Sequence, residues 1–77
     1  MNMVFETIKK MLADQLKTSE AKIVPQARLV EDLGADSANV MVLIMELEDK
    51  FGVMVDDDAI VNLKTVGDVV KYIESKQ

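Results

Sequence analysis

An apolar segment at residues 37–51 restricts the possible folds of this chain more than any other feature. It contains six consecutive apolar residues, Val40 to Met45, and it stops at Gly52. A buried strand is the competing interpretation, but the segment length, its Met, Glu and Leu content and the glycine stop favour a helix. A helix that packs on one side needs only about half of its positions apolar, so part of this run must face outward. We expect an exposed apolar strip that includes Val42 and Met45.

A helix and a long loop precede this segment. Residues 4–17 carry apolar side chains at three- and four-residue spacing, which predicts a helix. A loop over residues 18–36 follows, interrupted by Pro25 and Gly34. It is longer than most connections, but it has enough apolar residues to lie over a core. These residues are Ile23, Val24, Leu29, Val30 and Leu33.

Two shorter elements complete the chain. A short third helix is expected at residues 57–63, and Thr65 with Asp68 three positions later predicts the start of a last helix that runs to residue 75. The side of this helix that faces inward is predicted to consist of Val66, Val69, Val70 and Ile73. A chain of 77 residues without cysteine makes one small domain, residues 1–77, held by packing alone. The predicted fold class is all-α, a small helical bundle with a long loop between its first and second helices.

Ser37 lies where the loop ends and the apolar helix begins, directly after Asp36. A serine at such a junction commonly serves as an N-cap, but Asp36 could cap the helix and leave the Ser37 hydroxyl pointing outward. The chain has no histidine and no cysteine, so Ser37 lacks the usual general base of a nucleophile. It is better suited as a place where another enzyme attaches a group. The same composition excludes the usual zinc and haem ligand sets, and no metal site is predicted.

The acidic residues are concentrated around this junction. Residues 31–58 hold nine carboxylates and one lysine, a net charge of −8, whereas the rest of the chain carries +3. Such a surface repels the phosphates of nucleic acids and attracts basic patches on proteins. It could be merely a solvated surface, but its coincidence with Ser37 favours a docking face. The candidate partner-binding residues are Asp36, Val42, Met45, Glu46, Glu48 and Asp49.

Three blocks of sequence carry a resemblance to a known family. They are VEDLGADS at residues 30–37, LEDKFGV at 47–53 and KTVGDVVKYI at 64–73. In these blocks and in their spacing the chain resembles acyl carrier proteins over nearly its whole length. The resemblance implies a four-helix bundle in which a phosphopantetheinyl transferase attaches 4′-phosphopantetheine, taken from coenzyme A, to Ser37, with Asp36 as its neighbour in the motif.

The same resemblance implies the function. The thiol of the arm would carry acyl groups as thioesters in fatty acid or related lipid or polyketide biosynthesis. The implied partners are acyl-transferring and elongating enzymes with basic docking patches. The six methionines then have two interpretations. They fill gaps in a small core, or they make the interior deformable enough to open around an acyl chain.

The chain departs from the family pattern in its second helix. Carrier proteins of fatty acid synthesis usually have Leu, Asp and Glu where this chain has Ala38, Asn39 and Val42. Two acids that typically meet basic partner patches are therefore missing. This implies either service to a specialised pathway or a variant with an altered docking surface.

Two other classes of function were compared with the carrier. A structural or regulatory interaction module of the same fold would bind partners through the acidic, partly apolar second helix without carrying cargo. An enzyme is disfavoured, because paired carboxylates such as Glu48 and Asp49 work as acid and base only in a concave site with shifted pKa values. No apolar run reaches the ~20 residues that span a bilayer, and no signal peptide is visible. We therefore expect a soluble, cytoplasmic monomer without catalytic activity.

Overall fold

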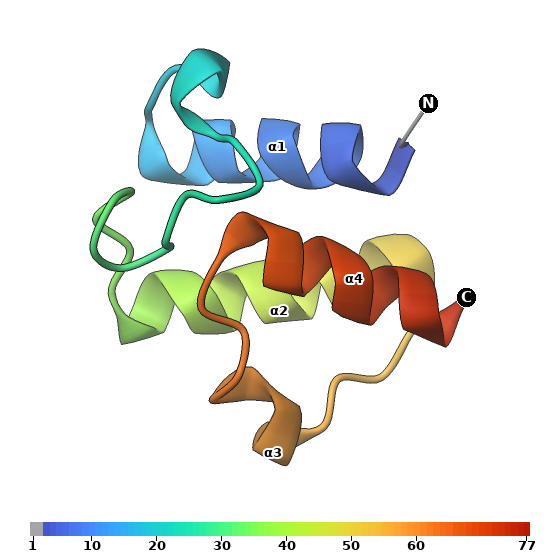
Figure 1. Ribbon diagram of the computed structural model, residues 1–77. Coiled ribbons are helices and arrows are strands. Elements are labelled where there is room, and N and C mark those ends of the chain that lie inside the picture. Colours follow the sequence, from blue (N-terminus) through green and yellow to red (C-terminus); the bar gives the residue numbers. More distant parts are fainter. Residues whose placement is uncertain (1–2) are drawn as a thin grey trace.

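Three helices lie side by side in the computed structural model, which describes residues 3–77 (Figure 1). They are α1 (Met3–Leu16), α2 (Ser37–Phe51) and α4 (Val66–Lys76); the short elements are the 3₁₀ turn η1 (Glu20–Lys22) and the helix α3 (Asp57–Ile60). α1 packs against both α2 and α4 and runs in the opposite direction to them (Figure 1). Residues 3–77 contain helices and one isolated bridge but no strand, so the predicted all-α bundle is confirmed.

The core between the three long helices is aliphatic. Ile8 of α1, Leu47 of α2 and Val66 of α4 are each 0% exposed. The four residues predicted for the inward side of α4 are all buried, which confirms the spacing argument. Burial of branched apolar side chains is the main favourable term in folding a domain this small.

The methionines do not form the core. Met3, Met41, Met45 and Met54 are 75%, 48%, 64% and 77% exposed, and Met11 is only partly buried. Both interpretations of the methionines, as gap fillers and as a deformable interior, were therefore wrong for Met3, Met41 and Met54, whereas Met45 is exposed as predicted for the apolar strip. Met1 lies outside the described residues. Leu, Ile and Val fill the space between these closely packed helices with fewer rotatable bonds to immobilise.

The long loop is fastened to the beginning of α4. Three backbone hydrogen bonds join the two segments: Leu29 N–H to Lys64 O at 2.9 Å, Val66 N–H to Ala27 O at 3.0 Å and Gly67 N–H to Pro25 O at 2.9 Å. Ile23 and Leu29 enter the core at 1% exposure, whereas Val24 and Val30 remain exposed at 43% and 57%. The loop therefore lies over the core as expected, but through only some of the residues predicted to hold it there.

Two predicted helices end earlier than expected. The first stops at Leu16, because Lys17 adopts a left-handed conformation with φ 54°. The third was expected over residues 57–63 but spans only Asp57–Ile60. Turn hydrogen bonds follow it, from Asn62 N–H to Ala59 O and from Leu63 N–H to Ile60 O. The shorter i to i+3 spacing of these bonds closes the last turn and directs the chain toward α4.

Asp68 and Thr65 form the predicted capping box at the start of α4. The Asp68 N–H donates to Thr65 Oγ1 at 3.1 Å, and Asp68 Oδ2 accepts from the N–H groups of Thr65 at 3.0 Å and Lys64 at 3.1 Å. The backbone N–H of Thr65 lowers the pKa of Asp68 most, against the opposing effect of burial. The backbone N–H of Lys64, the Thr65 side chain and the charge of Lys71 add to this lowering of the pKa. The carboxylate thereby fixes the segment to which the long loop is bonded.

We expect this carboxylate to make stability dependent on pH. Because the folded-state pKa lies below the unfolded value of about 3.9, the stabilisation is complete above that pH and is lost as the pH falls through the folded-state pKa. Urea unfolding at pH 7 and pH 3 checks this. Asp68→Asn should lose less stability between the two pH values than the parent does, whereas an equal loss in both proteins would contradict the assignment.

Candidate functional site

The beginning of α2 is closed by a reciprocal pair of side chains. Asp36 is the N-cap: its Oδ1 accepts from the Asn39 N–H at 2.8 Å, and its own N–H donates to Asn39 Oδ1 at 3.1 Å. The prediction that Asp36 caps this helix is confirmed. The contribution of Asn39 was missed, although the spacing of an aspartate and an asparagine three residues apart could have indicated it. A cap of this kind contributes about 1 kcal/mol to helix stability.

The loop enters α2 through a tight turn at Gly34. This residue has φ 73°, a left-handed conformation that costs a non-glycine residue about 1–2 kcal/mol. A Cβ added there would meet no atom within 4 Å, so glycine is needed for its backbone conformation and not for space. Ala35 follows with its side chain buried at 4% exposure and its N–H bonded to Leu29 O at 2.9 Å. The turn is therefore anchored in the core just before Asp36.

Ser37 is exposed on the first turn of α2. Because Asp36 supplies the cap, the Ser37 hydroxyl has no hydrogen-bond partner within residues 3–77. The capping box uses the N–H groups of Asp36 and Asn39, which leaves those of Ser37 and Ala38 without an acceptor in the described part of the chain. Free N–H groups and the helix dipole favour negative charge at this position. The residues present therefore fit a phosphodiester on Ser37.

An apolar strip extends along the exposed side of α2 from this end. Val42 and Met45, predicted for it, are 46% and 64% exposed, and Met41 joins them at 48%. Met41 was not predicted, although it belongs to the same run of six apolar residues. The exposed positions recur three and four residues apart, so they line one side of the helix. An exposed apolar strip with acids at its edge is typical of an interaction surface.

The acidic residues near the strip differ in how they are held. Glu46 and Asp49 are exposed, and their carboxylates have no ion-pair or hydrogen-bond partner within residues 3–77. Glu48 is only partly exposed, and its Oε2 accepts from the Val55 N–H at 2.9 Å, which ties the segment after α2 to the helix. Asp32 is paired with Arg28, whose backbone N–H lowers the pKa of Asp32. Fewer carboxylates are therefore free to meet a partner than the net charge of −8 over residues 31–58 indicated.

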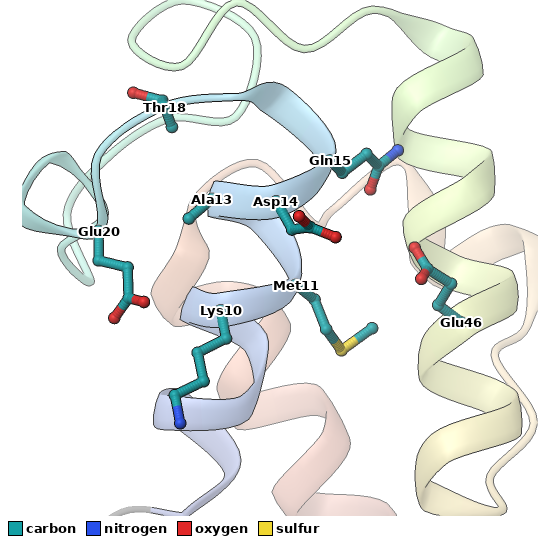
Figure 2. A pocket seen from close by; sticks show the side chains of 8 residues that line it. All are labelled: Lys10, Met11, Ala13, Asp14, Gln15, Thr18, Glu20 and Glu46. Carbon is teal, nitrogen blue, oxygen red and sulfur yellow. The ribbon is translucent and has the colours of Figure 1, made fainter.

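Two hollows in the surface have polar linings. One is an open cleft of about 690 Å³ beside α1, η1 and α2, shown in Figure 2. Its lining residues are Lys10, Met11, Ala13, Asp14, Gln15, Thr18, Glu20 and Glu46. The other adjoins α3, where Asp56, Asp57 and Asp58 lie. Within residues 3–77 no group of three or more acidic, histidine or cysteine side chains is placed to hold a metal ion, and neither hollow has an apolar lining suited to an acyl chain.

Comparison with known proteins identifies the family. Residues 6–73 match the family model described as the phosphopantetheine attachment site. An acyl carrier protein of Helicobacter pylori strain G27 is 49% identical over 74 residues, which cover 96% of this chain and 95% of that protein. The chain belongs to the acyl carrier protein family. A second Helicobacter pylori relative, from strain ATCC 700392 / 26695, is also named acyl carrier protein and is 47% identical over 74 residues, with the same coverage of both chains.

The fold agrees with this assignment. The solved acyl carrier protein of Enterococcus faecalis superposes with a TM-score of 0.84 at 32% identity and covers 96% of this chain and 94% of that one. The protein is therefore a carrier of acyl groups on a 4′-phosphopantetheine arm. Acyl carrier proteins are carriers rather than catalysts, and they work with a phosphopantetheinyl transferase and with biosynthetic enzymes. The alternative of an interaction module without cargo is not favoured.

Proposed function

We propose that Ser37 is the residue that carries the arm. The observation that supports this most strongly is its exposed hydroxyl, which the capping by Asp36 leaves unused. The arm supplies a thiol on which acyl groups are held as thioesters, chemistry for which this cysteine-free chain has no group of its own. The other serines, Ser19 and Ser75, use their side chains in the local bonds Ala21 N–H to Ser19 Oγ and Ser75 Oγ–H to Tyr72 O.

The experiment is arm transfer followed by intact-mass measurement. The purified chain without an arm is incubated with coenzyme A, magnesium and a broad-specificity phosphopantetheinyl transferase. We expect a gain equal to one phosphopantetheine group per chain. No gain, with a known acyl carrier protein modified in parallel, would contradict the proposal.

A second proposal concerns the domain, its oligomeric state, its lack of catalysis and the pathway that it serves. Residues 1–77 act as a single, monomeric carrier domain without catalysis of its own, in fatty acid or related lipid or polyketide biosynthesis. Two observations support the lack of catalysis: Glu48 is engaged with the Val55 N–H, and neither Glu48 nor Asp49 lines either of the described hollows.

In residues 3–77 no helix has the length and apolar character to cross a membrane. The compartment we propose is the cytoplasm, with which the lack of cysteine is compatible.

We also propose that partners dock on the exposed side of α2. Val42 and Met45, together with Met41, would meet an apolar patch on the partner. Glu46, Asp49 and Asp36 are exposed at its edge and would face basic residues. Glu48 stays in the proposed set, but its bond to Val55 means that a substitution there also loosens the chain after α2. The departure at Val42 favours a partner that matches an apolar surface.

Asp49 gives the cleaner test of electrostatic steering. We expect Asp49→Lys to slow association with carrier-dependent enzymes about threefold at low salt, because an exposed charge at an interface edge is worth about 0.2–1 kcal/mol. The difference should shrink as salt is added, since screening at physiological ionic strength acts over about 8 Å. Association rates measured by stopped flow check this. Glu74→Lys, an exposed acid near the end of α4, is the matched control, and equal slowing by both variants would mean that the acidic side is only a solvated surface.

A further inference from the structure

The Gln15 side chain joins α1 to the first turn of α2. Its Nε2 donates to the backbone oxygen of Asn39 at 2.6 Å, in a partly buried bond between residues 24 positions apart in the sequence. Figure 2 shows this side chain reaching from α1 toward α2 with its amide nitrogen turned to that helix. The bond therefore fixes one end of α2 against a neighbouring helix, independently of the bonds within α2 itself.

Gln15 contacts the same turn that presents Ser37. Asn39 is held by Asp36 through both of its capping-box bonds, at 2.8 and 3.1 Å. Ser37 lies between these two residues and is itself exposed, without a side-chain partner in the described part of the chain. The position of its hydroxyl is thus set by the turn alone, and besides the N-cap Asp36 it is Gln15 of α1 that holds this turn.

The two polar atoms of the Gln15 side chain are used unequally. Its Oε1 is buried and accepts no hydrogen bond from any residue in the range 3–77. An unpaired buried acceptor costs more free energy of folding than a single neutral hydrogen bond returns. A methionine would occupy nearly the same volume without a buried polar atom. The amide is therefore distinguished from an apolar side chain of the same size by its one bond, to Asn39 O.

We infer that Gln15 is a positioning residue for the transfer of the arm to Ser37, an inference that rests on the proposed function of Ser37. In that step Ser37 Oγ forms a bond to the pantetheine-side phosphorus of coenzyme A. The bond from this phosphorus to the oxygen of 3′,5′-ADP breaks, its electron pair leaves with the ADP, and the Oγ proton passes to a base on the transferase. Reaction requires the attacking oxygen to be held within about 3–3.5 Å of the phosphorus, and small displacements reduce the rate strongly.

The decisive variant is Gln15→Met, which removes the donor and the unpaired acceptor together. We expect its unfolding midpoint in urea to equal or exceed that of the parent. We expect kcat for arm transfer to fall about three- to tenfold with KM within about twofold, because the turn still binds the transferase but holds Oγ less well. Gln26→Met, the same substitution at an exposed position in the long loop, is the control and should match the parent in all three quantities.

A rescue variant separates the donor from the rest of the side chain. Gln15→Lys restores an N–H donor, and the carboxylates of Asp14 and Glu46 line the same cleft (Figure 2) and offset its charge. We expect its kcat to return to within about twofold of the parent. The inference is overturned if Gln15→Met has the kcat of Gln26→Met, if it is less stable than that control, or if Gln15→Lys fails to restore kcat. If the parent itself accepts no arm, it is the proposed function of Ser37 that fails.

Discussion

Ser37→Ala is expected to abolish arm transfer completely while leaving the fold intact. The Ser37 hydroxyl has no partner within residues 3–77, and alanine is the best helix former, so nothing that stabilises α2 is lost. The variant lacks the only oxygen to which, in our proposal, the phosphate is transferred. Intact mass after incubation with coenzyme A and a transferase should therefore remain that of the unmodified chain.

The control for this variant is Ser75→Ala. Ser75 is exposed near the end of α4, and its hydroxyl donates only to Tyr72 O at 2.7 Å. Its removal should cost little stability and leave the mass gain unchanged. An undiminished gain in Ser37→Ala would show that the arm is attached elsewhere.

Leu47→Ala is expected to cause the largest loss of stability of any substitution discussed above. Leu47 is 0% exposed in the second half of α2, facing the core between the helices. Truncating a buried leucine removes its transfer free energy and leaves a cavity, at a cost of about 2–5 kcal/mol. Small domains have only about 5–15 kcal/mol in total. The urea midpoint should therefore fall steeply at an unchanged m-value.

Met45→Ala is the matched comparison on the same helix. Met45 is 64% exposed, so its truncation should change the free energy of unfolding by about 0.5 kcal/mol or less. The two variants shorten side chains of similar size two residues apart. Equal losses would mean that α2 does not face the core as described, whereas the expected difference separates the packed side of α2 from its proposed docking side.

The features of the fold that could be predicted from the sequence are those that depend on residues close together in the chain. The limits of α2 follow from Asp36 and Gly52, which cap its two ends, and the start of α4 follows from Thr65 with Asp68. The exposure of Val42 and Met45 follows from a run too long for one side of a helix. Each of these signals lies within a few residues of the feature that it determines.

The features that were missed depend on contacts between distant segments. The bond from the Val55 N–H to Glu48 was not predicted, because it forms only once the chain turns back after α2. The bond from Gln15 to Asn39 crosses between two helices. Met3, Met41 and Met54 were assigned to the interior because apolarity alone does not distinguish a core position from an exposed one, whereas the exposure of Met45 was predicted. Periodicity and composition predict neither the bond between Glu48 and Val55 nor the bond between Gln15 and Asn39.

The central claim is that this chain carries its cargo on an arm attached to Ser37. The most direct measurement is fragmentation mass spectrometry of the protein purified from its own cells, without added transferase. Our account predicts the phosphopantetheine mass, free or acylated, on the fragment that contains Asp36 and Ser37 and on no other. A native protein without the arm, or with the arm on a fragment that contains Ser19 or Ser75 in place of Ser37, would contradict it.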